Sequence, residues 1–349
     1  MRAFRYDETL TRLLTPEISS LLSAIHEYKG KQDFYLGAKP DTLDALLEIA
    51  KIQSTDASNR IEGIYTTDKR LRELVAQKTT PRNRNEREIL GYRDVLATIH
   101  ESHDAIPVTP SVIRQLHRDL YRFCDVSFAG HWKDSDNVIA ERTAGGRMVA
   151  RFVPTSAAAT PGAIERICEE HGRWVKDGTY DPLLVSLVFT FDLVSIHPFS
   201  DGNGRMSRLL TLLLTYRSGY TIGKYVSIEA EIERTKSTYY DALAASSSGW
   251  AEGEADYAPF VTYMLGVMAA CYADLDARVA LLSSGGKGED ILRAYFEGLV
   301  GTVTKRKILD DNPTLSRRTA ERVLQKLQAE GVIEKVGAAR ATVYRRVES

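Results

Sequence analysis

Between two apolar segments the chain reads HPFSDGNGRMSR over residues 197–208. Pro198 disfavours the α region for the histidine before it, so the preceding helix is expected to end there. Gly202 and Gly204 allow backbone conformations that are closed to other residues, and they lead into a predicted helix over residues 205–216. Free N–H groups at the start of such a helix bind anions. The stretch therefore predicts an anion site at a helix N-terminus, next to a histidine.

Four side chains of this stretch supply the other parts of a phosphate-transfer site. Arg205 and Arg208 lie three residues apart on the first helical turn, where the helix dipole disfavours cations unless an anion lies between them. Asp201 can hold Mg²⁺, and His197 can accept a proton. Taken singly, the histidine has a structural interpretation and the aspartate could cap the helix. Together the residues favour phosphoryl or nucleotidyl transfer, which needs positioning, charge neutralisation and a proton acceptor.

The stretch resembles the signature of the Fic (filamentation induced by cyclic AMP) family, His-x-Phe-x-(Asp/Glu)-Gly-Asn-Gly-Arg-x-x-Arg, at every fixed position. The resemblance implies a protein adenylyltransferase, which moves AMP from ATP to a Tyr, Thr or Ser hydroxyl of a protein. It implies that His197 deprotonates this hydroxyl and that Asp201 binds Mg²⁺. Other members transfer UMP or phosphocholine, so the transferred group stays open. By the same resemblance, the nucleotide phosphates are held by Gly202, Asn203, Gly204, Arg205 and Arg208.

The resemblance extends to about residues 40–275 and includes a second nucleotide element and a hairpin. Tyr239 and Tyr240 look like the family's Tyr-Tyr element beside the nucleotide base. Two β-prone runs, 137–139 and 147–153, flank a Thr-Ala-Gly-Gly sequence and predict a β-hairpin. This hairpin resembles the flap that clamps the target segment, and its assigned residues are Val138 and Ile139.

An inhibitory element is predicted at residues 58–63, which read SNRIEG. Ser58 and Glu62 are one helical turn apart, and Gly63 can end the helix. A carboxylate that faces the phosphate cradle would pair with an arginine and keep it from the γ-phosphate. The stretch resembles the family's pattern (Ser/Thr)-x-x-x-Glu-(Gly/Asn), which implies Arg208 as the partner and an N-terminal inhibitory helix. Glu62 could instead orient a water for AMP removal, so transferase and hydrolase both stay open.

The C-terminal segment is basic. Residues 304–349 contain 11 Lys or Arg and 6 Asp or Glu, in a chain whose net charge is −1. Helical patterns at 291–299 and 316–330, followed by β-prone runs at 332–336 and 342–347, predict a winged helix. A basic helix and hairpin suit DNA binding, with the helix in a groove and the hairpin on the backbone. Protein contacts or dimer packing are the competing interpretation.

The expected fold class is mainly α: a Fic-type helical core with a small β-hairpin flap, plus a C-terminal winged helix-turn-helix domain. The expected divisions are an N-terminal helical region with the inhibitory motif (1–110), a Fic catalytic core (111–282), a Ser/Gly-rich linker (283–289) and the winged helix (290–349). A second functional hypothesis is a DNA-binding regulator whose Fic core senses nucleotide.

Composition limits the cell compartment and the partners that can be expected for the chain. The three cysteines are far apart and form no CxxC pair, which argues against disulfides and a thiolate zinc site and fits a reducing cytoplasm. The apolar stretch Pro182–Ile196 is too short to span a bilayer, so no membrane partner is expected. The expected partners are ATP, Mg²⁺ and a target protein, which includes the chain itself through auto-modification. The resemblance also implies a homodimer.

Overall fold

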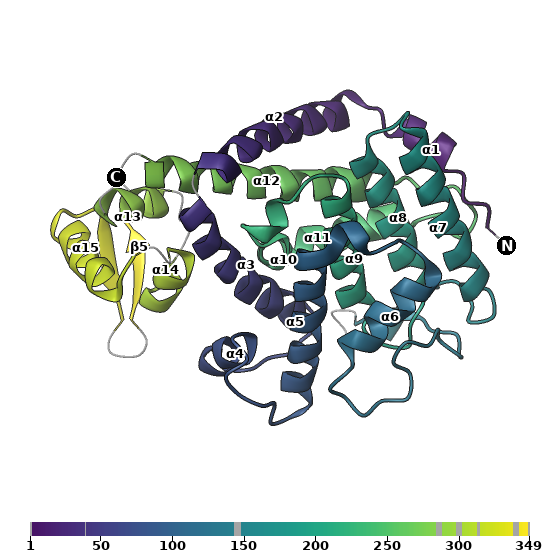
Figure 1. Cartoon of the computed structure of the whole chain (residues 1–349), viewed down its shortest axis with the longest axis horizontal. Coiled ribbons are helices and arrows are strands. Elements are labelled where there is room, and N and C mark those ends of the chain that lie inside the picture. The colour runs from purple at the N-terminus through teal and green to yellow at the C-terminus, as the bar shows by residue number, and fades with distance from the viewer. Residues whose placement is uncertain are drawn as a thin grey trace. The chain divides into compact units, whose positions relative to one another are not determined.

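The computed structural model describes residues 2–38, 40–142, 148–283, 288–297, 302–312, 315–337 and 342–347. The chain divides into two compact units. The first comprises Met1–Gly30 with Ala50–Tyr272, and the second comprises Lys31–Ile49 with Ala273–Ser349. Helices dominate the chain (Figure 1), so the predicted mainly α class is confirmed.

Helices of short and medium length make up most of the first unit: α1 (Tyr6–Arg12), α4 (Asp68–Val75), α5 (Arg84–Ser102), α6 (Pro110–Leu120), α7 (Thr160–Asp177), α8 (Pro182–Ile196), α9 (Asn203–Arg217), α10 (Ile228–Arg234) and α11 (Lys236–Ser247). Single 3-10 turns occur at His103–Ala105 and Ile222–Lys224. Longer helices begin in one unit and end in the other: α2 (Pro16–Ala38), α3 (Pro40–Ile61) and α12 (Ala258–Ser283).

Helix α8 is the buried core helix of the first unit. It packs against α7, α9 and α1 (Figure 1), and every side chain from Leu183 to Ile196 except Val194 is buried. A helix that is apolar on all sides has no face to offer to water, so it lies inside. The helix ends at Ile196, as Pro198 predicts, and the next residue takes the left-handed conformation with φ 52°. The core helix therefore fixes the position of His197.

Helix α9 begins at Asn203, two residues before the start expected from the sequence. Gly202 occupies the N-cap with φ 79°, a conformation that favours glycine. The Asn203 side chain closes the preceding loop, since its Oδ1 accepts from Phe199 N at 2.9 Å and its Nδ2 donates to Phe199 O at 2.7 Å. These side-chain bonds hold the asparagine at the helix start, which shifts the boundary from Arg205.

A two-stranded antiparallel hairpin is present where the flap was predicted. Strand β1 (Ile139–Arg142) pairs with β2 (Met148–Phe152), with an irregularity between Ile139 and Ala140. The first strand begins two residues later than the predicted run. The turn at 143–147 lies outside the described residues.

The second unit ends in a small α/β module, drawn in yellow and green in Figure 1. It contains α13 (Gly288–Glu297), β3 (Thr302–Thr304), α14 (Lys305–Asp311), α15 (Arg317–Ala329), β4 (Ile333–Val336) and β5 (Val343–Arg346). The strands form an antiparallel sheet in the order β3-β5-β4. The predicted helices and hairpin are present, whereas α14 and β3 were not foreseen. Both elements are too short to show a helical or strand periodicity of apolar residues in the sequence.

The module has its own apolar core. Ala320, Val323, Leu324 and Leu327 of α15 are buried, as the predicted apolar stripe requires. They pack with Leu292, Phe296, Ile308 and Ile333 in one cluster. Most of the predicted linker, residues 284–287, lies outside the described residues.

One helical segment in the described part of the chain, Ala258–Val279 of α12, is long and apolar enough to cross a membrane. Half of its most apolar window is buried inside the protein. A core helix of a globular protein meets the same criteria.

Candidate active site

Five of the seven predicted nucleotide residues line one cavity of about 470 Å³ in the first unit, and Gly202 and Arg205 are not among its lining residues. The loop before α9 and its first turns contribute His197, Asn203, Gly204, Ser207 and Arg208. The other walls come from the end of α3, the flap and α11, through Glu62, Ile139, Arg151, Phe152, Tyr239, Tyr240 and Leu243. Residues far apart in the sequence thus meet around a single pocket.

The N-terminus of α9 forms the floor for an anion. No side chain caps this terminus, and Gly202 at the N-cap leaves the first N–H groups without intrahelical partners. Gly204 permits close approach here, because an added Cβ would lie 2.1 Å from Glu62 Oε1 and 3.3 Å from Arg208 Nη1. The predicted anion cradle therefore borders the cavity at Asn203 and Gly204.

His197 presents a neutral imidazole to the cavity. Burial, and after it the charge of Lys133, lowers its pKa to about 4, against smaller opposing effects that include those of Glu62 and Asp201. Its Nδ1 is buried without a hydrogen-bond partner among the residues that the structure describes. At neutral pH the ring can accept a proton. A bound polyphosphate would raise this pKa, because nearby negative charge favours the imidazolium.

Arg208 is held by the predicted inhibitory residues. Its Nη2 donates to Glu62 Oε1 at 2.8 Å and to Ser58 O at 2.9 Å, and its Nε donates to Ser58 Oγ at 2.8 Å. Only 3% of the arginine side chain is exposed, against 33% for the glutamate. The structure thus brings Ser58, Glu62 and Arg208 together at the edge of the cavity.

Arg205 does not join them. Its Nη2 pairs with Glu88 Oε2 at 2.7 Å and donates to Tyr121 Oη at 2.8 Å, and the side chain is 1% exposed. It is absent from the described residues that line the cavity. Three residues on an α-helix correspond to about 300°, so the two arginines point about 60° apart. Arg205 faces α5 and Tyr121 at the end of α6, whereas Arg208 faces α3, so of the two arginines the structure brings only Arg208 to the cavity.

Asp201 lies in the loop before α9 with its side chain 47% exposed, and it is not among the described residues that line the cavity. Its Oδ1 accepts from Gly202 N at 2.7 Å, and Arg84 Nη2 lies 3.5 Å from its Oδ2. No group of three or more His, Cys, Asp or Glu that could bind a metal occurs in the described ranges. A single accessible carboxylate nevertheless suits Mg²⁺, which is commonly held by one or two carboxylates, substrate phosphates and water. The Mg²⁺ would have to displace Arg84.

The flap reaches the cavity through one of its two predicted residues and through two that the sequence did not single out. Ile139 lines the cavity, as do Arg151 and Phe152 on the opposite strand. Val138, which precedes β1, is 54% exposed and is not among the lining residues. On α11, Tyr239 is buried beside Tyr240, with ring centroids 5.4 Å apart.

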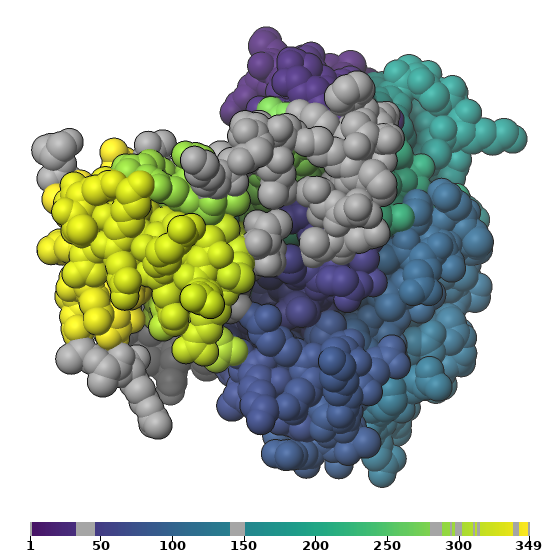
Figure 2. All heavy atoms as spheres, turned by 60° about the vertical axis from the view of Figure 1, so that its left-hand side comes forward, coloured from purple at the N-terminus to yellow at the C-terminus, as the bar shows by residue number. Residues whose placement is uncertain are grey.

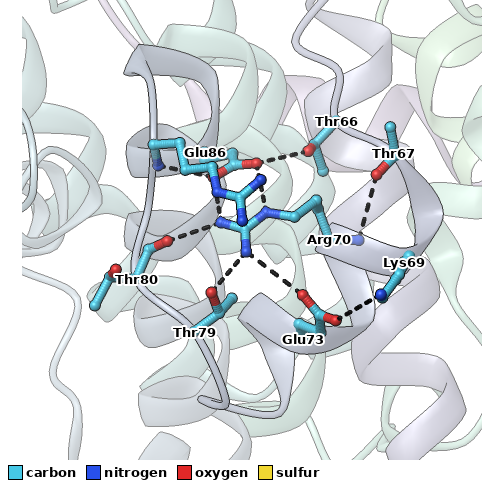
Figure 3. A network of polar contacts seen from close by, with 9 residues as sticks. Thr66, Thr67, Lys69, Arg70, Glu73, Thr79, Thr80 and Glu86 are labelled. Carbon is cyan, nitrogen blue, oxygen red and sulfur yellow. Dashed lines mark hydrogen bonds and ion pairs between the residues drawn. The ribbon is translucent and has the colours of Figure 1, made fainter.

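A buried ion-pair network fixes the segment that follows Glu62 (Figure 3). Arg70 Nε and Nη2 donate to the two oxygens of Glu86 at 3.0 and 2.7 Å, a bidentate pairing. Thr66 Oγ1 donates to the same carboxylate at 3.1 Å, and Arg70 Nη2 also donates to Thr80 O. The network ties α4, which lies in the blue surface region of Figure 2, to the start of α5. It thereby holds the segment that follows α3.

Replacing Arg70 with glutamine is expected to lower the thermal unfolding midpoint by several degrees, because it leaves Glu86 buried without its charged partner. Lys69→Gln is the matched control: its ion pair with Glu73 is long, 3.8 Å, and exposed, so the midpoint should hardly change. Differential scanning calorimetry measures both.

The effect of Arg70 should depend on pH. The Arg70 hydrogen bond lowers the pKa of Glu86 to about 2, so its contribution is complete above the unfolded-state pKa of about 4.3. It is lost as the pH falls through 2. The difference in unfolding free energy between the wild type and Arg70→Gln should therefore shrink on acidification. A difference that stays constant would contradict this assignment.

Comparison with known proteins agrees with this geometry. Residues 107–215 match the Fic/DOC family. The chain is 28% identical over 189 residues to protein adenylyltransferase fic-1 of Caenorhabditis elegans, covering 52% of this chain and 32% of the relative. It is 28% identical over 250 residues to protein adenylyltransferase Fic of Drosophila melanogaster, covering 70% of this chain and 43% of the relative. The chain thus spans less than half the length of these two relatives.

Solved structures share the fold. A Fic family protein from Desulfovibrio desulfuricans G20 aligns with a TM-score of 0.61 at 21% identity, covering 96% of this chain and 97% of that one. Fic-1 from C. elegans (residues 134–508 of that protein) aligns with a TM-score of 0.57 at 22% identity, covering 76% and 74%. The protein therefore carries a Fic domain over residues 107–215, as the resemblance of its signature implied.

Proposed function

We propose that the chain is a protein adenylyltransferase that transfers AMP from ATP to a hydroxyl side chain of a protein. The observation that carries this proposal is the convergence on one cavity of a neutral imidazole, an uncapped helix N-terminus and a buried arginine. The adenylyltransferase names of the relatives support it at the level of the family.

In the proposed reaction the oxygen of the target hydroxyl attacks the α-phosphorus of ATP. His197 takes the proton of that hydroxyl, the bond between the α-phosphorus and the bridging oxygen breaks, and pyrophosphate leaves. The backbone N–H groups at Asn203 and Gly204 bind the phosphates, and Arg208 binds the γ-phosphate once it is free. Tyr239 and Tyr240 flank the base, and the flap strand beginning at Ile139 holds the target segment.

Mg²⁺ would be held by Asp201 and would neutralise phosphate charge. This chain's own contribution there is the placement of the carboxylate. Gly202 N donates to it, and Arg84 holds it when no cation is bound.

Glu62 is proposed to keep the enzyme in a low-activity state. The carboxylate pairs with Arg208 at 2.8 Å, and the γ-phosphate needs the same guanidinium. A carboxylate at the cavity wall could also orient a water for removal of AMP from a modified protein. The same residue thus supports a second candidate activity, protein de-adenylylation.

Mass spectrometry of the Glu62→Gly protein after incubation with mixed nucleotides and Mg²⁺ tests the proposal. A mass increase equal to AMP, on a Tyr, Thr or Ser of this chain, is expected. Such a mass increase would identify the nucleotide donor and the modified residue, and it would show that the chain modifies itself. An increase equal to UMP or phosphate would contradict the assignment of AMP.

DNA is the proposed ligand of the C-terminal module. Arg317, Arg318 and Arg322 of α15 are exposed on the side opposite its buried stripe. Several cations of the module, Arg317 included, are paired with carboxylates: Arg317 and Lys305 with Glu321, and Lys326 with Glu289. Binding is therefore expected to be weak and sensitive to salt. A mobility shift of the full chain that is unchanged in Arg318→Ala/Arg322→Ala would contradict it.

A further inference from the structure

Lys133 links the catalytic loop to the root of the flap. Its Nζ donates to Ile196 O, on one side of His197, at 3.2 Å, and its backbone N donates to Pro198 O, on the other side, at 2.9 Å. The same Nζ donates to Asn137 Oδ1 at 2.8 Å, two residues before strand β1 begins. One residue therefore bonds to both neighbours of the imidazole and to the start of the hairpin.

The lysine is buried but does not touch the cavity. It is 3% exposed, and it is absent from the described residues that line the pocket. Burial lowers its pKa to about 8, so the ammonium is still mostly charged at neutral pH. Keeping this ammonium charged inside the protein costs solvation free energy. Its three N–H donors have two acceptors among the described residues, Asn137 Oδ1 and Ile196 O, which offset this cost only in part.

The backbone of His197 needs external support. Its φ of 52° lies in the left-handed region, which non-glycine residues adopt at a free-energy cost of roughly 1–3 kcal/mol and keep only where surrounding contacts hold them. Lys133 supplies such contacts on both sides of the histidine: the carbonyl oxygen of Ile196 accepts from its side chain, and that of Pro198 accepts from its backbone N–H.

We propose that Lys133 is a positioning residue for the transfer reaction. It fixes the left-handed turn that aims the imidazole into the cavity, and it couples that turn to the flap. The inference rests on the proposed adenylyltransferase function. Within the described part of the chain, the hydrogen bonds of Lys133 go to Asn137 and to the residues on either side of His197, and none goes to a residue assigned to the phosphates, so its loss slows the proton-transfer step without weakening ATP binding.

Charge adds a second effect that can be measured directly. The groups that set the imidazole's charge are Lys133, Glu62 and Asp201, together with the Val194 carbonyl. Lys133 opposes protonation and the others favour it. Removing the ammonium should therefore raise the pKa of His197 from about 4, by about one unit for a like charge at close range.

The test uses full-length protein in the Glu62→Gly background, so that basal activity is measurable. Lys133→Met keeps the apolar stem and the backbone bond to Pro198 but removes the side-chain donors and the charge, whereas Lys133→Arg keeps charge and side-chain donors. Lys224→Met is the matched control, because burial also lowers the pKa of Lys224 but its ammonium lies against the Tyr216 ring, 5.6 Å from the centroid. Thermal unfolding identifies any variant that fails to fold.

Lys133→Met is expected to lower kcat for AMP incorporation about tenfold or more while KM for ATP stays within about twofold. Lys133→Arg should recover most of the rate, and Lys224→Met should match the parent. An unchanged kcat in Lys133→Met, or a loss that appears only in KM, would overturn the inference.

The imidazole signal of His197, assigned by its absence in His197→Ala, provides a readout that does not need activity. By NMR the pKa of this imidazole should rise in Lys133→Met and stay near the parental value in Lys133→Arg and Lys224→Met. If the parent transfers no AMP, the proposed function fails while the pKa shift still supports or refutes the role of Lys133. An active parent with an unshifted pKa would refute that role alone.

Discussion

Replacing Glu62 with glycine is expected to raise AMP incorporation about 10- to 100-fold, because a hydrogen bond between charged partners contributes roughly 1.5–3 kcal/mol. The substitution frees the Arg208 guanidinium, which now donates to the carboxylate at 2.8 Å. Glu62 follows the last residue of α3, so glycine does not interrupt the helix. Intact-protein mass spectrometry against time measures the rate.

Two controls separate release of Arg208 from a general loosening of the fold. Glu62→Gln keeps the size of the side chain and removes its charge, so it should give an intermediate rate. Glu252→Gly removes an exposed glutamate from a turn in the same unit and should leave the rate unchanged. A Glu62→Gly protein that incorporates AMP no faster than the wild type would contradict the inhibitory role.

Replacing His197 with alanine in the Glu62→Gly background is expected to lower the rate about 10²- to 10⁴-fold, the usual contribution of a positioned general base. The imidazole is neutral at pH 7, since burial lowers its pKa to about 4, and it faces the cavity beside the N-terminus of α9. Single-turnover incorporation at saturating ATP measures the loss.

Affinity for ATP should change little in His197→Ala, because the phosphates are assigned to the backbone of α9 and to Arg208. Isothermal titration of ATP checks this point. His131→Ala removes an exposed histidine and is expected to retain the parental rate. A His197→Ala protein that is still fully active would place the base elsewhere.

The local sequence was enough to predict those parts of the site whose conformation depends on neighbouring residues in the chain. Pro198 ended α8 at Ile196, Gly202 opened the start of α9, and the spacing of Ser58 and Glu62 put both on one side of α3, facing Arg208. In each case the conformation follows from residues within one helical turn. The apolar run of α8 likewise predicted a buried helix, and it is buried.

Other contacts required knowledge of partners distant in the chain. Arg205 matches the signature as well as Arg208 does, yet Glu88 on α5 takes its guanidinium. Lys133 carries no motif of its own, and its role depends on carbonyl oxygens 63 and 65 positions further on. A one-dimensional pattern contains neither pairing, since each is made only when α5, α9 and the flap root pack together.

The network of Arg70 and Glu86 shows the same limit. Both residues are charged and would be expected at the surface, but they are 8% and 3% exposed. Glu86 precedes Ile89 and Leu90 by one helical turn, and those apolar residues mark the buried face of α5. This spacing is a weak indication that Glu86 is buried. The arginine that satisfies it lies on a different helix.

Transfer of AMP can be distinguished from transfer of another part of the nucleotide by the position of the label. Parallel incubations of Glu62→Gly use ATP labelled at the α-phosphorus or at the γ-phosphorus. Protein-bound label is expected from the α-position only, and none when His197 is also replaced by alanine. Label retained from the γ-position would show phosphoryl transfer and would refute adenylylation as the reaction of this cavity.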